Sequence, residues 1–131
     1  MNNLIEVKFI SSYKGRGVFA KKLIKKGTTI EKAHVILIPN EDYDQIEDTC
    51  IYDYIFSWED PQHPESLNAL AMGICQFVNH SYRPNLCYYY DYDDQTIEFV
   101  AIKNIQKGEE LTINYNGEID DKSPMWFKMK E

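Results

Sequence analysis

The residues best suited to binding or chemistry lie in three short stretches, 15–17, 79–81 and 108–115. The first reads Gly-Arg-Gly, the second reads Asn-His-Ser, and the third ends at Tyr115. Glycines let a backbone approach a ligand closely, and polar side chains that follow a buried run can face one. Each stretch also has an ordinary structural explanation, since glycines form turns, polar side chains satisfy loop backbone and tyrosines pack in cores. Taken one at a time, the stretches favour the structural explanation.

The order and spacing of the three stretches resemble those of the SET-domain protein methyltransferases, and look most like the minimal SET domains of viruses and bacteria. The resemblance runs from about Val7 to Trp126, and 110–115 carries the family's Glu-Leu-x-x-x-Tyr pattern. It implies a mainly β fold with short helices, in which small β-sheets are joined by a knot-like crossing of the C-terminal segment. It also implies transfer of a methyl group from S-adenosylmethionine to a protein lysine.

The resemblance assigns binding of S-adenosylmethionine to these stretches and to the tail. Residues 14–17 would line the amino-acid end of the cofactor, Asn79 would bind that charged end, and His80 would bind adenine chiefly through its backbone. His80 has a second explanation of comparable weight, which is to hold the fold by hydrogen bonds. The expected crossing brings Tyr115 beside Asn79, and Trp126 would cover the adenine. The implied cofactor-binding residues are Lys14, Gly15, Arg16, Gly17, Asn79, His80, Tyr115 and Trp126.

Tyr115 is the implied catalytic residue, because it closes the family's Glu-Leu-x-x-x-Tyr pattern. The methyl of a sulfonium is already reactive, so catalysis needs a neutral amine in line with it in a dry channel. A tyrosine hydroxyl and backbone carbonyls can orient that amine, and this chemistry requires neither a metal nor a carboxylate base. Tyr54 and Tyr88 resemble the tyrosines that line the lysine channel, although ordinary strand packing explains them equally well. Ile113 stands where many relatives carry Phe or Tyr, which leaves the number of transferred methyl groups open.

The length of 131 residues predicts one domain, with the SET domain at 4–117 and a tail at 118–131 that completes the active site. No apolar run approaches the roughly eighteen residues of a membrane span, and no secretory signal is expected. The cysteines, Cys50, Cys75 and Cys87, are widely spaced and odd in number, which argues against a disulfide framework, a zinc site and the family's zinc-binding flanks. An intracellular, cytoplasmic location is expected, or a nuclear one if the source is a virus or a eukaryote.

The formal net charge is −7, and acidic residues are concentrated in the middle of the chain. No lysine or arginine lies between Lys32 and Arg83, whereas acidic residues recur from Glu41 to Glu65. This segment could be a solvated face or a surface that attracts a basic partner. A basic protein or peptide is therefore the expected partner. No membrane partner is expected. Direct binding of nucleic acid is not expected either, because phosphate contacts need a basic face.

Short strands joined by tight turns are the elements predicted to position these residues. Apolar runs that alternate or are rich in β-branched residues predict strands at 4–10, 35–38, 86–92, 96–102 and 111–115. Turns are predicted at 11–17, 25–27, 93–95 and 107–108. Segment 40–58 is expected to form a short helix followed by a strand. The clearest helix is predicted at 65–77, with an apolar stripe of Leu67, Leu70, Ala71, Ile74 and Cys75.

Three hypotheses follow for the function. The leading one is an S-adenosylmethionine-dependent protein-lysine methyltransferase that acts on a basic tail or loop of a histone-like or other protein. The second is a catalytically silent SET-fold module that binds a peptide or the cofactor. The third is a homodimeric scaffold, since minimal SET domains can pair to complete their sites. The enzyme is favoured because all of the main catalytic positions are filled.

Overall fold

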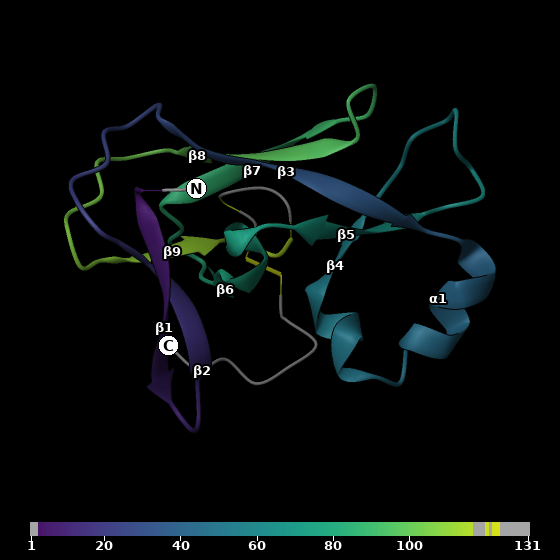
Figure 1. The fold of residues 1–131 in the computed structure, drawn as a ribbon, viewed down its shortest axis with the longest axis horizontal. Coiled ribbons are helices and arrows are strands. Elements are labelled where there is room, and N and C mark those ends of the chain that lie inside the picture. Colours follow the sequence, from purple (N-terminus) through teal and green to yellow (C-terminus); the bar gives the residue numbers. More distant parts are fainter. Residues whose placement is uncertain (1–2, 117–119, 121, 124–131) are drawn as a thin grey trace.

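The computed structural model describes residues 3–116, 120 and 122–123. Strands form the larger part of its regular secondary structure and are accompanied by short helical segments, as predicted (Figure 1). The strands are β1 (Ile5–Ser11), β2 (Gly15–Ala20), β3 (Thr29–Ile38), β4 (Ile55–Ser57), β5 (Asn68–Met72), β6 (Asn79–His80), β7 (Leu86–Asp91), β8 (Thr96–Ala101) and β9 (Glu110–Ile113). The helical segments are α1 (Asn40–Ile46) and two 3₁₀ helices, η1 (Cys50–Tyr54) and η2 (Ile74–Phe77).

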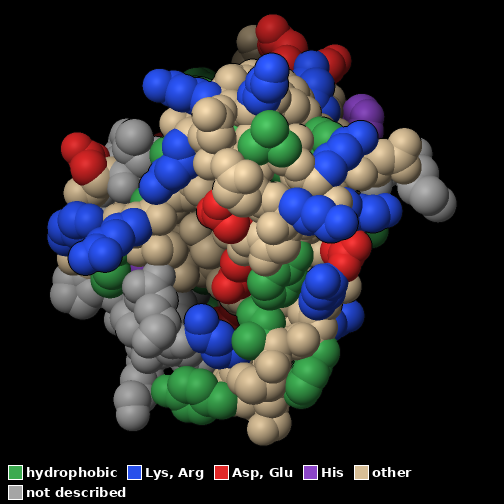
Figure 2. All heavy atoms as spheres, turned by 90° about the vertical axis from the view of Figure 1, so that its left-hand side faces the viewer, with side chains coloured by type: hydrophobic (Ala, Val, Ile, Leu, Met, Phe, Trp, Pro, Cys, Tyr) green, Lys and Arg blue, Asp and Glu red, His purple; other side chains and the backbone are tan. Residues whose placement is uncertain are grey.

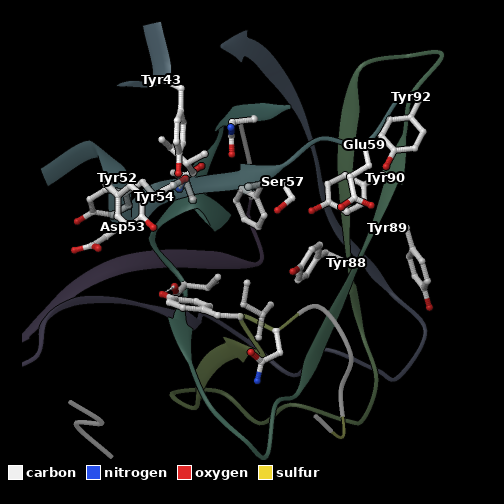
Figure 3. A pocket seen from close by; sticks show the side chains of 18 residues that line it. Tyr43, Tyr52, Asp53, Tyr54, Ser57, Glu59, Tyr88, Tyr89, Tyr90 and Tyr92 are labelled. Carbon is white, nitrogen blue, oxygen red and sulfur yellow. Dashed lines mark hydrogen bonds between the residues drawn. The ribbon is translucent and has the colours of Figure 1, made fainter. Parts of the chain in front are cut away.

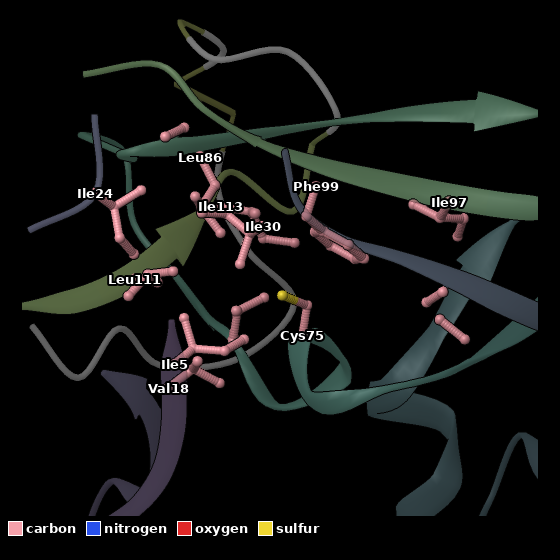
Figure 4. Close-up of a cluster of buried hydrophobic side chains, with 14 of the residues drawn as sticks. Ile5, Val18, Ile24, Ile30, Cys75, Leu86, Ile97, Phe99, Leu111 and Ile113 are labelled. Atoms are coloured by element: carbon pink, nitrogen blue, oxygen red, sulfur yellow. The ribbon is translucent and has the colours of Figure 1, made fainter. Parts of the chain in front are cut away.

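The strands form two sheets around a common core. A four-stranded sheet has the order β1-β2-β9-β6, and a five-stranded sheet has the order β4-β5-β3-β8-β7. Along β8 the buried residues recur at alternate positions, so one face of the larger sheet covers the core. Buried side chains from both sheets and from η2 meet there (Figure 4). Members labelled in the figure are Ile5, Val18, Ile24, Ile30, Cys75, Leu86, Ile97, Phe99, Leu111 and Ile113.

Most of the predicted strands are confirmed, with small shifts at their ends. β3 is longer than the predicted 35–38, because residues 29–34 continue the strand and pair with β8. β7 and β8 form the predicted hairpin, and Gln95 takes a positive φ of 54° in its turn. Segment 40–58 contains the predicted helix and strand, α1 and β4, with η1 between them. Across the described ranges, no helix has the length and apolar character needed to cross a membrane.

The helix predicted at 65–77 is wrong. This segment forms β5, which lies between β3 and β4, and the short helix η2, with Gly73 at the boundary. Burial alternates along β5 as it does in a strand: Ala69 and Ala71 are buried, whereas Met72 is 57% exposed. A strand on each side satisfies the backbone hydrogen bonds of β5, so tertiary pairing overrides the local helical spacing of the apolar residues.

The turn predicted at 11–17 is shorter in the structure. Residues 12–14 form the turn, and Gly15 begins β2, which pairs with β1 in antiparallel register. Gly15 has a φ of 76°, a conformation that favours glycine where a tight turn ends, whereas Gly17 pairs with Lys8 in the ladder. The Gly-Arg-Gly stretch is therefore the start of a strand, and sheet pairing fixes its backbone.

Strand β9 lies beside the Asn-His-Ser segment. β9 runs between β2 and β6 and pairs with β6 in parallel. The Asn85 side chain then bonds to β9, donating to the Glu110 carbonyl (2.8 Å) and accepting from the Thr112 N–H (2.9 Å). This arrangement corresponds to the knot-like crossing that the resemblance implied, and it brings the end of β9 next to β6.

The carboxylate of Glu31 anchors η2 to β3. It accepts hydrogen bonds from the backbone N–H groups of Ile74 (3.1 Å) and Cys75 (2.8 Å), which the start of a helix leaves without internal partners. Gly73 makes room for this contact, because a Cβ there would lie 2.6 Å from the Glu31 carboxylate. Since η2 leads into β6, Glu31 helps to position the polar residues of that strand.

Replacement of Glu31 by glutamine is expected to lower the free energy of unfolding by about 1 kcal/mol, because charge-assisted hydrogen bonds are stronger than neutral ones. Glutamine keeps the length of the side chain but turns an amide donor toward N–H donors. Urea denaturation measures the difference, with Glu47→Gln at the exposed end of α1 as the matched control. Equal stabilities of the Glu31→Gln and wild-type proteins would contradict the anchoring role.

Candidate functional site

A cleft of about 640 Å³ lies where β7, the η1–β4 segment and the end of β9 meet. Tyrosines form much of its wall, and Figure 3 shows Tyr43, Tyr52 and Tyr54 on one side and Tyr88 and Tyr90 on the other. Residues that line it elsewhere include Val78, Ile113, Tyr115 and Asn116. A concave site walled by aromatic rings, with a few polar groups, is the usual form of a site for a small ligand or a single side chain.

Tyr115 follows β9 and is hydrogen-bonded through both its side chain and its backbone. Its hydroxyl donates to the Val78 carbonyl (2.8 Å), and its N–H donates to Nδ1 of His80 (3.0 Å). Burial raises the pKa of Tyr115 well above its ordinary value, and the electrostatic influence of Tyr54 and Asp53 raises it further. The hydroxyl therefore stays protonated at neutral pH and acts as a hydrogen-bond donor.

Burial of tyrosines also predicts how stability depends on alkaline pH. The folded-state pKa values of Tyr115 and Tyr90 are raised above the ordinary value of about 10, in each case mainly by burial. The unfolded chain ionises these groups first, so the free energy of unfolding is expected to fall as pH rises above about 10, and to be unaffected by them below it. Denaturant titrations on both sides of that pH measure the slope. Tyr115→Phe should make it shallower, and an unchanged slope would contradict the effect of burial.

The structure brings the three predicted channel residues into this cleft. Tyr54 reaches it from the end of η1, Tyr88 from β7 and Ile113 from the end of β9. Tyr54 packs edge-on against Phe77 with ring centroids 6.2 Å apart, and Tyr88 packs edge-on against Phe56 at 5.3 Å. Edge-to-face contacts of this kind fix the planes of the rings, so the walls are preorganised. The role of these residues toward a substrate stays a prediction.

A second cluster joins the Gly-Arg-Gly strand to Asn79. The Asn79 amide donates to the Arg16 carbonyl (3.1 Å) and to the Glu110 carboxylate (2.7 Å). Gly17 lies against this pair, since a Cβ there would approach Glu110 to 2.7 Å and Asn79 to 3.1 Å. Within the described ranges, the side-chain oxygen of Asn79 accepts no hydrogen bond. That oxygen is therefore available to accept a hydrogen bond from a ligand.

Arg16 and Gly15 border this cluster. The Arg16 guanidinium lies over the Phe77 ring, 4.4 Å from its centroid, and forms no ion pair with a carboxylate of the described residues. Gly15 has open space where a Cβ would project. Lys14 lies in the preceding turn, where its N–H donates to the Ser11 hydroxyl (2.9 Å). An open position beside a cation and backbone N–H groups suits a ligand carboxylate.

His80 has the structural role considered in the sequence. It is 5% exposed, and its Nδ1 accepts the hydrogen bond from the Tyr115 N–H. Its ring packs at 90° to that of Tyr82, with centroids 4.5 Å apart. These contacts hold β6 to the end of β9. Binding of adenine by the His80 backbone stays a prediction, and Trp126, which was also predicted to contact adenine, lies outside the described residues.

Glu110, Asn85 and Tyr90 contribute to these clusters, although the sequence did not single them out. Glu110 accepts from Asn79, Asn85 bonds to β9, and Tyr90 lines the cleft. Tyrosines at alternate positions of 88–92 were a signal for Tyr90, because alternate residues of a strand share a face. Glu110 opens the Glu-Leu-x-x-x-Tyr pattern, but no local signal indicated its contact, since its partner Asn79 lies in β6, 31 residues away in the sequence.

Acidic side chains contribute to the cleft and to a neighbouring pocket. Asp53 and Glu59 line it, whereas the acidic residues of α1 do not. A shallower pocket beside it shares Tyr89, Tyr90 and Tyr92 with the cleft. The acidic residues that line this second pocket are Asp60, Asp91, Asp93 and Glu98. The acidic surface therefore draws on the β7–β8 hairpin as well as on the segment 41–65 that the sequence indicated.

Comparisons with known proteins identify what the chain is similar to. The model of the SET domain family matches residues 15–116. The "Histone-lysine N-methyltransferase, H3 lysine-37 specific" of Schizosaccharomyces pombe is 31% identical over 116 residues, which cover 88% of this chain and 71% of that protein. The histone-lysine N-methyltransferase SUV39H1 of Xenopus laevis is 32% identical over 120 residues, 84% of this chain and 28% of that protein. A solved structure from Plasmodium falciparum, assigned as a histone methyltransferase, has a TM-score of 0.66 and 26% identity, covering 98% of this chain and 100% of that one.

Proposed function

The chain belongs to the SET-domain family, and we propose that it is an S-adenosylmethionine-dependent protein-lysine N-methyltransferase that acts on a basic protein tail or loop. The observation that carries the proposal is the tyrosine-walled cleft, which holds the partly buried Tyr115, whose hydroxyl donates to the carbonyl of Val78, the chain neighbour of Asn79. The curated relatives are histone-lysine methyltransferases, which supports lysine as the acceptor.

The residues around Asn79 fit the amino-acid end of the cofactor. An ammonium group needs an acceptor, which the side-chain oxygen of Asn79 can supply. A carboxylate needs cations or N–H donors, which the Arg16 guanidinium and the backbone of 15–17 can supply. Gly17 supports this fit, because a side chain there would fill the space beside Asn79. The backbone of His80 and the ring of Trp126 are proposed for the adenine end.

The bound cofactor would supply a methyl group on a sulfonium centre. The chain's own task is to deliver a neutral lysine amine, and deprotonation of an ordinary lysine near neutral pH costs about 4 kcal/mol. The aromatic walls of the cleft lower this cost, because desolvation disfavours the charged amine. The Tyr115 hydroxyl and the Val78 carbonyl would orient the amine. Tyr54, Tyr88 and Ile113 would line the path of the lysine side chain.

The acidic surface around the cleft supports a basic substrate. Asp53 and Glu59 lie where residues next to the target lysine would pass, and the adjoining pocket adds further carboxylates. Charges at the rim of a site attract an oppositely charged partner and mainly raise its association rate. A basic segment, such as a histone-like tail, is therefore the substrate class that we propose.

The double variant Asp53→Asn/Glu59→Gln replaces the two acidic residues of the cleft. We expect it to raise the Michaelis constant for a basic peptide several-fold. The effect should be larger at about 0.01 M salt than at about 0.15 M, because the screening length falls from roughly 30 Å to about 8 Å. Asp44→Asn/Glu47→Gln removes the same charge from residues that do not line the cleft and should change the constant less. Equal effects of the two double variants at both salt concentrations would contradict attraction by the cleft.

Methyl transfer tests the proposed function directly. The full chain is incubated with radiolabelled S-adenosylmethionine and a panel of basic proteins that includes core histones, and mass spectrometry locates the modified residues. Methylation of lysine is the expected result. Cofactor binding in calorimetry without transfer to any protein would overturn the proposal in favour of a silent binding module. Light scattering of the same sample measures whether the chain forms a homodimer.

A further inference from the structure

Two turns on the side of the molecule away from the cleft are built alike. Residues 21–27 and 102–108, here called the paired turns, lie at the left of Figure 1 and are joined by hydrogen bonds of 2.8 Å in both directions between Ile24 and Ile105. Each turn ends in a glycine of positive φ, 90° at Gly27 and 89° at Gly108. The Gly27 N–H donates to the carbonyl of Ala101, the last residue of β8, and the Gly108 N–H donates to the carbonyl of Ala20, the last residue of β2. These bonds join the two turns into one unit.

The paired turns concentrate positive charge on a chain that is acidic overall. They hold no acidic residue, and without their lysines the rest of the chain would carry −13 instead of the formal −7 of the whole. Each of these lysines is exposed, and none forms an ion pair with another described residue. Figure 2 looks onto this side of the molecule, where Lys and Arg side chains predominate among the charged groups. The six lysines are Lys21, Lys22, Lys25, Lys26, Lys103 and Lys107.

The bridge between Ile24 and Ile105 holds the lysines of the two turns on the same side of the molecule. Lysines stand two residues before and two residues after each bridged isoleucine: Lys22, Lys26, Lys103 and Lys107. Like charges gathered in this way repel one another, and the paired turns contain no carboxylate to offset them. The next acidic residue along the chain, Glu109, accepts a backbone N–H of the second turn (2.9 Å). A partner with closely spaced negative charges would relieve this repulsion.

We propose that the paired turns bind the sugar–phosphate backbone of duplex DNA. The duplex carries about one negative charge per 1.7 Å of its axis, and lysines contact phosphates without reading sequence. Protein interfaces, by contrast, are depleted in lysine and enriched in aromatic residues, methionine and arginine, none of which occurs in the paired turns. The expectation that the chain does not bind nucleic acid rested on the lack of a basic face in the sequence, whereas the fold brings the lysines of two distant turns together at one side.

This surface is separate from the cleft, because none of the residues that line the cleft belongs to the paired turns. DNA binding therefore goes beyond the proposed methyl transfer and does not depend on it. The two charged sides together suit a substrate whose basic protein tails are held on DNA. The acidic surface would take the tail, and the lysines would contact the phosphates.

Fluorescence anisotropy of a short labelled duplex of random sequence, with the full chain and no cofactor, tests the proposal. The wild-type protein is expected to bind at low salt, with an affinity that falls steeply as salt rises. The variant K22Q/K26Q/K103Q/K107Q should bind at least tenfold more weakly, with its logarithmic salt slope reduced by about 0.9 for each phosphate that it no longer neutralises. The matched variant K22R/K26R/K103R/K107R keeps the charge and should bind as the wild type does, which separates loss of charge from loss of folding.

A second comparison controls for net charge. K26Q/K107Q and K8Q/K32Q each remove two positive charges, but Lys8 already pairs with Glu6 (3.2 Å) and neither control lysine lies in the paired turns. The first variant should weaken binding clearly more than the second. The proposal is overturned if the wild-type protein does not bind the duplex at low salt, or if the two variants lose affinity equally. In a competition experiment, polyglutamate and unlabelled duplex are compared at equal concentrations of negative charge. If polyglutamate displaces the labelled duplex at lower doses than unlabelled duplex does, the proposal is overturned and an acidic protein is indicated as the partner.

Discussion

Replacing Tyr115 by phenylalanine is expected to lower the single-turnover rate of methyl transfer at least tenfold, while the affinity for S-adenosylmethionine stays close to that of the wild type. A factor of ten corresponds to about 1.4 kcal/mol, the scale of one well-placed hydrogen bond. The substitution removes the hydroxyl that donates to Val78 and keeps the ring that lies 5.2 Å from the ring of His80. The fold should therefore persist, and the loss should fall on alignment of the amine. Rapid-quench kinetics at saturating peptide, with calorimetry of the cofactor, measure both quantities.

Tyr54 and Tyr88 provide matched controls for this substitution. Both line the same cleft, and the phenylalanine variants of all three residues lose one hydroxyl each. Because Tyr54 and Tyr88 form the walls, their loss should alter substrate fit or the number of methyl groups added more than the rate. If Tyr115→Phe keeps the full rate while either control abolishes it, the catalytic role belongs to a different tyrosine.

Replacing Asn79 by alanine is expected to weaken binding of S-adenosylmethionine at least tenfold in calorimetry. The change removes the proposed acceptor for the cofactor's ammonium group and also breaks the bonds from the amide to Arg16 and Glu110. Without those bonds, the carboxylate of Glu110 loses its partner in the cluster, so both a ligand-binding group and part of the preorganisation of the site are removed.

Asn104→Ala is the matched control, since Asn104 is exposed, lies outside both clusters and accepts the Lys26 N–H (2.8 Å). It should leave the affinity for the cofactor unchanged. Circular dichroism establishes that the Asn79→Ala protein is folded. Unchanged cofactor affinity in that folded variant would remove Asn79 from the cofactor site.

Strand positions were predictable from the sequence where the signal is local. The hairpin of β7 and β8 shows this, because apolar and polar residues alternate along 96–102 and a polar turn precedes it. β3 was recognised from its β-branched run, although pairing with β8 lengthened it beyond what that run indicated. The start of β2 was assigned to a turn, because two glycines signal a turn whether or not a neighbouring strand later pairs with them.

The failure at 65–77 has a physical cause. Apolar residues there recur at three- and four-residue intervals, which is a helical spacing, yet Ala69 and Ala71 also satisfy the alternation of a short strand. Strands β3 and β4 decide between the two by offering hydrogen bonds on both edges. Neither strand is close enough in sequence for a local pattern to reveal this.

The candidate site was predictable only through the spacing of its motifs. The resemblance placed Tyr115 near Asn79, and the structure brings the two together through Val78 and His80. Local rules gave no reason for Glu110 to contact Asn79, since the contact depends on the parallel pairing of β6 with β9. The turns at 25–27 and 107–108 were likewise predicted one by one, whereas the bridge between them belongs to the tertiary fold.

Because β9 lies between β2 and β6, the four-stranded sheet cannot form until β9 has been synthesised. β1 and β2 are made before β9 and can form a hairpin, but the second edge of β2 has its partner in β9, where Leu111 lies opposite Val18. Until β9 emerges, that edge presents unpaired N–H and C=O groups and an apolar surface to other nascent chains. Pairings of such long sequence separation form slowly. The period before β9 is made is therefore one in which the open edge of β2 favours aggregation, and a chaperone that covers β2 at that stage would protect the nascent chain.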